Sequence, residues 1–215
     1  MIRCERVASV AGPRSPASAQ APRGNFYGTG LVGAVDAFEK RYGRAAVHAV
    51  AAMISQKWPG VVSANAPTLG ILGAKKYGYA FVGDLGRAMV AAVHAPDEDV
   101  FIREVVGAGV DTTLNTVGRI VLRYAVSPDS IIARGQESWD MFHDAGSSHV
   151  VLRTENEYVV ELRDWPNHDV MVCKICLEAR RRVWEKTGVR DLEMRRERCQ
   201  AWGHESCAIR VRWRT

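Results

Sequence analysis

The sequence predicts an α+β fold in which several N-terminal helices pack on a C-terminal antiparallel sheet. Over residues 27–124, apolar side chains recur at the spacing of three and four that is typical of helices. Beyond residue 148, β-branched and alternating segments predict two strands, then one helical run, then two further strands. A run of helices followed by a largely antiparallel strand, strand, helix, strand, strand order favours the α+β class.

The first 25 residues differ in composition from the rest of the chain. They are rich in Ala, Pro, Ser and Arg and contain three prolines that disrupt regular structure: Pro13, Pro16 and Pro22. We expect a disordered leader over residues 1–25 and a single domain over residues 26–215, since a chain of 215 residues can bury one core. The apolar run Val7–Ala11 is too short for a secretory signal.

Helices dominate the N-terminal half. Two are expected before Pro59, separated by a stop at Gly43, and a third covers Tyr79–His94. Asp97 is a candidate N-cap for a fourth helix through Val106, because its carboxylate can accept a hydrogen bond from the first turn.

The clearest amphipathic pattern spans Asp111–Tyr124. Its apolar stripe, a pattern more often found in a core than in a ligand pocket, comprises Leu114, Val117, Val121 and Tyr124. Ser127 and Pro128 then open the next element as N-cap and first helical residue.

The C-terminal strands have short connections. The first two are joined by three polar residues, and the last two flank a turn at Trp202-Gly203. The expected strands are His149–Arg153, Tyr158–Arg163, Arg190–Cys199 and Ala208–Trp213, with a helix from about Cys173 to Gly188 between the second and the third.

Composition narrows the class of protein. No apolar run reaches the roughly 18 residues that a membrane-spanning helix needs. We therefore expect a cytoplasmic protein whose cysteines stay reduced. Net charge is +5, with much of the excess near the C-terminus. Nucleic-acid binding is not expected, because the late arginines alternate with apolar residues as on a solvated strand face and no DNA- or RNA-binding motif is evident.

Four of the five cysteines lie in the last 43 residues: Cys173, Cys176, Cys199 and Cys207. A Cys-x-x-Cys pair plus two later cysteines can form a tetrahedral zinc site, which with thiolates alone would be structural. The alternative is that these cysteines are ordinary buried core residues.

The pattern of Cys199, Trp202-Gly203 and Cys207, with Cys173 one helix upstream, resembles the vinyl-reductase-like small-molecule-binding domain. That superfamily includes ligand-binding domains of phenol-responsive activators, pigment-biosynthesis accessory proteins and subunits of the TRAPP complex. The chain also resembles a group of myxobacterial proteins of similar length, on Gly86-Arg87, the Ser127-Pro128-Asp129 segment and the closing turn.

This resemblance implies a zinc site and a ligand pocket. In zinc-binding members a glutamate stands three residues before the cysteine matching Cys199, whereas this chain has Arg196, so Cys176 or Glu197 would supply the missing ligand. The implied pocket holds a small apolar or aromatic molecule between helices and sheet. The expected ligand-binding residues are Tyr124, Trp139, Phe142, His143 and Trp165.

His143 invites a second interpretation, as a haem ligand or a general base. We favour a hydrogen-bonded histidine near a helix end, and haem is not expected, because a lone histidine specifies no cofactor. No nucleophile beside a base, paired carboxylates or phosphate-binding loop is evident, so an enzyme is not expected.

The resulting hypothesis is a non-enzymatic sensor or adaptor of TRAPP-like or vinyl-reductase-like fold. It would bind a small hydrophobic or aromatic molecule and signal through a homodimer, formed by its N-terminal helices, or through a protein partner. The first alternative is a ligand-free structural scaffold. The second alternative is a haem-based sensor.

Overall fold

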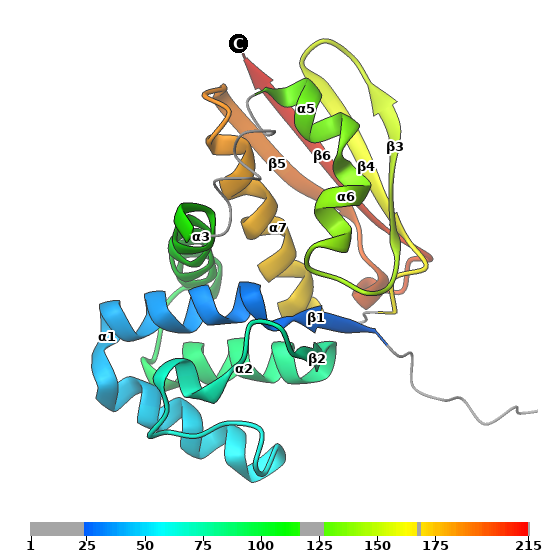
Figure 1. Ribbon diagram of the computed structural model, residues 1–215. Helices are drawn as coiled ribbons and strands as arrows, with labels where there is room; N and C mark the ends of the chain where they lie inside the picture. The colour runs from blue at the N-terminus through cyan, green and yellow to red at the C-terminus, as the bar shows by residue number, and fades with distance from the viewer. Residues whose placement is uncertain (1–23, 117–126, 167–168, 215) are drawn as a thin grey trace, which may run out of the picture.

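The computed structural model describes residues 24–116, 127–166 and 169–214 (Figure 1). Its helices are α1 (Gly28–Lys57), α2 (Tyr79–Ala92), α3 (Glu98–Thr116), α5 (Pro128–Ala133), α6 (Gly135–Asp140) and α7 (Val170–Glu185), with short 3-10 turns η1 (Pro67–Gly70) and η2 (Gln200–Trp202). Its strands are β1 (Asn25–Tyr27), β2 (Lys76–Gly78), β3 (Ser147–Arg153), β4 (Glu157–Arg163), β5 (Arg190–Arg198) and β6 (Cys207–Arg214).

The N-terminal part is helical. α1 bends sharply at Gly43, whose φ of 80° interrupts the helix at the stop that the sequence predicts. Gly33 of α1 and Gly109 of α3 allow these helices to touch backbone to backbone: a Cβ on Gly33 would lie 2.5 Å from the Gly109 carbonyl oxygen. The crossing of α1 and α3 therefore depends on two residues without side chains.

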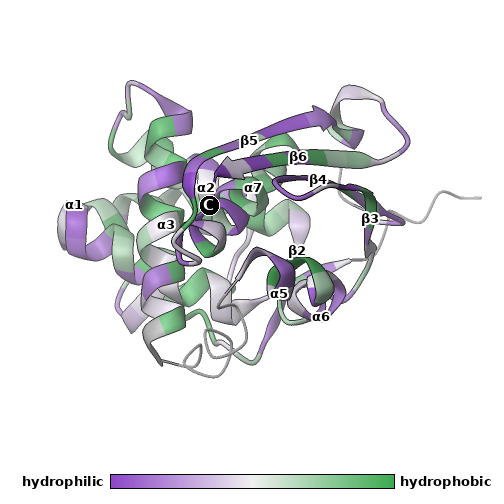
Figure 2. Ribbon diagram, turned by 90° about the horizontal axis from the view of Figure 1, so that it is seen from above, coloured by the Kyte–Doolittle hydropathy of each residue, from purple (hydrophilic) through white to green (hydrophobic). Residues whose placement is uncertain are grey.

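The C-terminal part is a four-stranded antiparallel sheet in the order β3-β4-β6-β5. One face is apolar because alternate residues point toward the core; on β4 and β6 these are Tyr158, Val160, Leu162, Ile209, Val211 and Trp213. Figure 2 shows the alternation of hydrophobic and hydrophilic segments along these strands. The predicted α+β class with an antiparallel sheet is confirmed.

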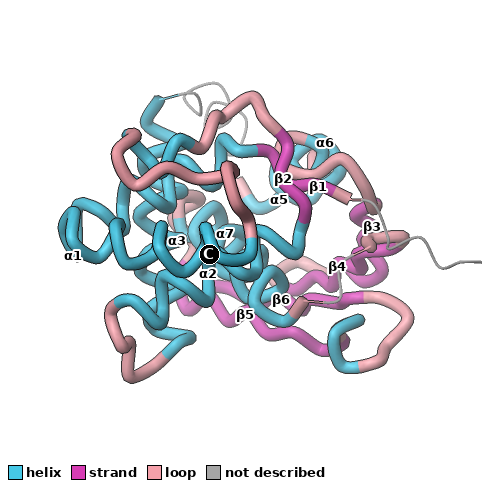
Figure 3. Tube along the Cα trace, turned by 90° about the horizontal axis from the view of Figure 1, so that it is seen from below, coloured by secondary structure: helices cyan, strands magenta, loops and turns pink. Residues whose placement is uncertain are grey.

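Helix α7 links the two parts, as the tube view from below also shows (Figure 3). Its first turn contributes Met171, Val172 and Cys173 to the larger core, whereas Trp184 near its end lies in a second cluster under the sheet. Asp169 caps the helix by accepting a hydrogen bond from the Met171 amide at 2.8 Å. The same carboxylate receives both guanidinium nitrogens of Arg87, at 2.9 Å each, which ties α7 to α2.

Several expected boundaries differ from the observed ones. The fourth helix starts as predicted, with Asp97 accepting from the Val100 amide at 3.0 Å, but it continues to Thr116 rather than ending at Val106. Ser127 caps α5 through the Ser130 amide, as predicted. Tyr124, with Val117 and Val121, lies outside the described residues, and so do residues 1–23 of the expected leader.

None of the helices in the described part of the chain is both long and apolar enough to cross a membrane.

Candidate functional site

His143 lies at the junction between the N-terminal segment and the helices that precede the sheet. Backbone contacts hold its loop against β1: Phe26 forms a bridge with His143, and the Tyr27 amide donates to the Phe142 carbonyl at 2.9 Å. Asp144 completes the attachment by accepting two hydrogen bonds from Asn25. The side chain of His143 is thereby buried, with 6% of its surface exposed.

Both ring nitrogens of His143 have neighbours. Nδ1 lies 3.0 Å from the Tyr79 hydroxyl, and Nε2 lies 3.9 Å from the Cys176 sulfur, which is at most a weak hydrogen bond. In the tautomer that carries its proton on Nδ1, the Nδ1–H group donates a hydrogen bond to the Tyr79 oxygen and the Nε2 lone pair points toward α7.

Aromatic rings surround the imidazole. Trp139 stacks on it, with centroids 3.7 Å apart and planes 11° apart, while Phe26 and Trp165 meet it edge-on at 5.0 and 5.8 Å. Burial, together with the positive charge of Arg180, lowers the pKa of His143 to about 3. The ring is therefore neutral at physiological pH, the form that can coordinate a metal.

The structure brings together three of the expected pocket residues, Trp139, His143 and Trp165, and places Phe142 beside them against Phe26 at 6.3 Å. Tyr124 is not among the described residues. Sequence analysis missed Tyr79, because its local pattern shows only a helix start and its partner is 64 residues away.

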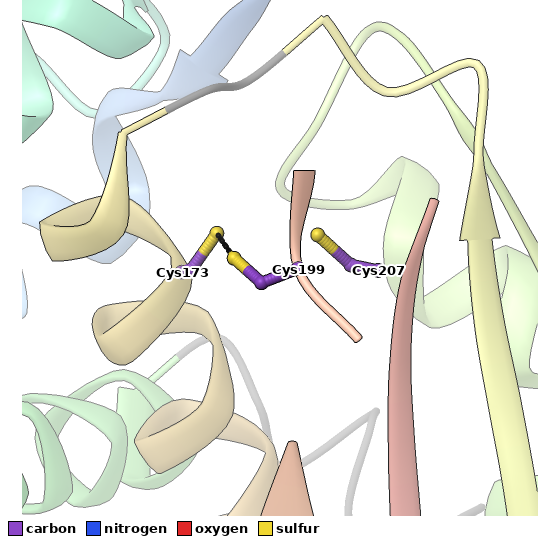
Figure 4. A group of neighbouring side chains, drawn as sticks. All are labelled: Cys173, Cys199 and Cys207. Atoms are coloured by element: carbon purple, nitrogen blue, oxygen red, sulfur yellow. Dashed lines mark hydrogen bonds between the residues drawn. The ribbon is translucent and has the colours of Figure 1, made fainter. Parts of the chain in front are cut away.

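Three cysteines form a separate buried cluster beside this site (Figure 4). The sulfur atoms of Cys173, Cys199 and Cys207 all lie within 4.8 Å of one another, and those of Cys199 and Cys173 are 3.5 Å apart. Helix α7 supplies the first, and the two ends of the β5–β6 connection supply the others. Cys176, one turn along α7, contacts His143 instead.

Hydrogen bonding inside the cluster polarises its thiols. The Cys199 thiol donates to the Cys173 sulfur at 3.5 Å, and hydrogen bonding between Cys173 and Cys207 lowers the pKa of Cys207 and, with burial, raises that of Cys173. The Gln200 amide also donates to the Cys207 sulfur at 3.3 Å. Arg196, which stands where a glutamate was expected, stacks its guanidinium over the Trp202 ring at 5.3 Å.

The comparisons with known proteins point to one fold. An H-NOX protein from K. algicida in the unliganded Fe(II) form matches with a TM-score of 0.62 at 12% identity, covering 88% of this chain and 97% of that one. An H-NOX protein from S. oneidensis in the Fe(II)NO state matches with a TM-score of 0.62 at 12% identity, covering 88% of this chain and 99% of that one. An oxygen-binding H-NOX domain related to soluble guanylate cyclases, in its oxygen complex, matches with a TM-score of 0.55 at 9% identity. The match covers 87% of this chain and 95% of that one.

A further matching structure, with a TM-score of 0.59 at 9% identity, comes from work on haem redox potential and porphyrin distortion. No protein-family model and no curated protein matches the chain. Identities this low show a shared fold and no more.

These matches correct four expectations. The resemblance to the vinyl-reductase-like domain and to TRAPP subunits is wrong, since the solved structures that share the fold are H-NOX proteins. The main functional hypothesis, a sensor of small hydrophobic or aromatic molecules, is wrong for the same reason. Structural zinc at the cysteines has no support, and the expectation against haem is overturned by the iron, nitric oxide, oxygen and haem named for these proteins.

The donor chemistry at His143 fits a haem iron. A neutral imidazole whose other nitrogen is held by a hydrogen-bonding partner is the usual form of a histidine ligand, and Tyr79 is that partner here. The space next to Nε2 is filled by the Cys176 thiol, and Trp139 covers one ring face. A haem would therefore have to displace the Cys176 contact from His143.

Proposed function

We propose that residues 26–215 form a haem-based sensor domain in which His143 would be the residue that binds the haem iron. The observation that carries the proposal is the buried, neutral imidazole, hydrogen-bonded to Tyr79 at Nδ1 and lying 3.9 Å from a thiol at Nε2, in a chain with an H-NOX-like fold. A bound haem would supply the chemistry that binds a diatomic gas.

Three features of the chain support this role for His143. Tyr79 fixes the ring orientation, since its hydroxyl holds Nδ1 at 3.0 Å. The surrounding rings of Trp139, Trp165 and Phe26 keep water away from the imidazole. Arg180, whose positive charge acts on His143 and whose guanidinium donates to the Tyr158 hydroxyl at 3.3 Å, would be a cation for a haem carboxylate.

The response would travel through α7. Cys176 contacts His143 from one face of this helix, and Cys173, one turn earlier, anchors the same helix to the β5–β6 connection. Displacing Cys176 from Nε2 would therefore shift α7, which among the described helices is the one that contributes to both hydrophobic clusters. This arrangement supports signalling through a change in association with a second copy or a protein partner.

Catalysis is not part of the proposal. The thiol beside His143 is that of Cys176, and burial raises the pKa of this thiol to about 12. A thiol held in its neutral form is a poor nucleophile. The domain would thus act as a sensor and not as an enzyme.

The test is the visible spectrum of the chain purified from cells supplied with a haem precursor. We expect a Soret band in the native protein and in His149→Ala, because His149 is an exposed residue on β3. The band should fall about tenfold or more in His143→Ala, as expected when the axial ligand is removed.

Either of two results would reject the proposal. One is a native protein that takes up no haem, even after addition of haemin to the purified chain. The other is a Soret band of equal strength in the His143→Ala variant, which would place the iron elsewhere. The first result would favour the ligand-free scaffold.

A further inference from the structure

Strand β3 forms one edge of the sheet and exposes three consecutive large apolar side chains. In the described part of the chain, no strand pairs with its outer edge. Val150, Val151 and Leu152 are 42, 47 and 40% exposed. Figure 1 shows β3 at the outer side of the sheet, and Figure 2 shows a hydrophobic section of the same strand. Contiguous apolar residues on an open edge are uncommon in monomers.

An irregularity in pairing explains why all three are exposed. Val150 pairs with Val160 and Leu152 pairs with Val159, so Val151 is an extra residue without a partner on β4. Such a bulge breaks the alternation that would bury every second side chain. The apolar edge of β3 is therefore built into the register of the sheet.

The opposite edge of the sheet is protected in the usual way. Strand β5 consists of charged residues except for Leu192 and Met194. Charged side chains discourage pairing with another strand, because they would have to be desolvated next to it. Of the two edges, β3 alone lacks this protection over its apolar centre.

We propose that β3 pairs with β3 of a second copy of the chain, antiparallel and around a two-fold axis. A two-fold axis brings the same surface of each copy together, so the apolar residues of one strand cover those of the other. Antiparallel pairing also places the two Arg153 side chains at opposite ends of the paired strands, so their positive charges are kept apart. Each Arg153 already has a partner in Asp129, at 2.6 Å.

Helix α1 offers a poorer surface for the same purpose. Its exposed cations Lys40, Arg41 and Arg44 are each paired with a carboxylate, and Met53 is the one large apolar residue of α1 that is exposed. An interface there would desolvate several ion pairs to bury one methionine. Pairing through Val150, Val151 and Leu152 of β3 would not require the desolvation of several ion pairs.

The edge is also connected to His143. The segment after His143 runs directly into β3, and the Ser148 amide donates to the Gln136 side chain of α6 at 2.6 Å. A shift of α6 would therefore change the position of β3. This connection rests on the proposed haem site, whereas pairing of β3 does not.

Sedimentation velocity of the full chain, without haem, tests the pairing. We expect a dimer in the native protein and a dissociation constant raised about tenfold or more in Val151→Lys, which places a charge at the centre of the interface. Leu72→Lys and Met53→Lys are the matched controls, because both replace an exposed apolar residue outside β3. Far-UV circular dichroism checks that each variant folds.

Hydrogen exchange of the native protein gives a second, independent readout. The backbone amides of residues 150–152 should exchange more slowly at high than at low protein concentration. A monomeric native chain overturns the proposal, and so does a dimer that survives Val151→Lys but is lost in Met53→Lys. Because no haem is present, failure of the haem proposal would leave this result unaffected.

Discussion

The hydroxyl of Tyr79 lies 3.0 Å from Nδ1 of His143, in a buried contact between residues 64 positions apart in the chain. Tyr79 belongs to the N-terminal helices, whereas His143 belongs to the loop that leads into the sheet. One hydrogen bond thus orients the candidate ligand and joins two segments that are otherwise packed through aromatic rings.

Replacing Tyr79 by Phe should destabilise the fold by about 1–3 kcal/mol, because a buried imidazole nitrogen loses its partner. Urea denaturation of native and variant protein measures the difference in free energy of unfolding. Tyr42→Phe is the control: among the described residues its hydroxyl has no hydrogen-bond partner, and we expect a much smaller effect. Equal losses in both variants would contradict the importance of the Tyr79 contact.

Stability should depend on pH through His143. Its pKa is lowered by burial from 6.5 to about 3 in the folded protein, so between these values the unfolded chain binds the extra proton. The contribution of neutral His143 to the free energy of unfolding is fully present above about pH 6.5 and is lost as the pH falls toward about 3.

His143→Gln should therefore show a shallower fall in the free energy of unfolding between about pH 6.5 and about pH 4. The exposed His149→Gln should keep the native slope. Urea titrations at a series of pH values measure both. A native slope in His143→Gln would mean that other groups cause the dependence.

The crossing of α1 and α3 should tolerate no side chain at Gly109. A Cβ there would lie 2.7 Å from the Ala34 backbone nitrogen, so Gly109→Ala should cost about 1–3 kcal/mol despite the better helix propensity of Ala. Gly107→Ala, two residues earlier in the same helix, would place its Cβ in ordinary contact with Arg182 Cδ at 3.8 Å and should stabilise by up to about 1 kcal/mol. If Gly109→Ala and Gly107→Ala changed the stability in the same direction, the result would argue against the close crossing of α1 and α3. Thermal melts measure both.

Asp169 has two roles that one pair of variants can separate. Asp169→Ala removes the cap of α7 and one of the two carboxylate partners of Arg87, the other being Asp84, and should cost at least about 1 kcal/mol. Asp169→Asn keeps a capping oxygen and should cost less. Denaturation of the two variants side by side gives the comparison. Equal costs would show that the ion pair, and not the cap, supplies the stability.

Local patterns predicted most of the elements. Gly43, Asp97 and Ser127 mark helix boundaries because each acts on its neighbours in sequence, through backbone conformation or a capping hydrogen bond. Strands β3, β4 and β6 are evident because β-branched residues recur in short runs between turns. These signals need no knowledge of the rest of the chain.

The candidate site was harder to predict for a physical reason. Trp139, His143 and Trp165 were identified as residue types, but their contacts with Tyr79 and Phe26 depend on how distant segments pack. The cysteine pattern was misleading in another way. Cys173 and Cys176 are three residues apart on α7, yet the first faces two cysteines and the second faces His143. Spacing alone does not distinguish these environments.

The most direct test of the central claim is a haem titration of the purified chain, followed by tryptophan fluorescence together with Soret absorbance. Trp139 and Trp165 flank His143, so a haem bound at this histidine should quench their emission and saturate at one haem per chain. The account predicts both signals in the native protein and the loss of both in His143→Ala. Haem binding that leaves the emission unchanged, or that is the same in the variant, would contradict it.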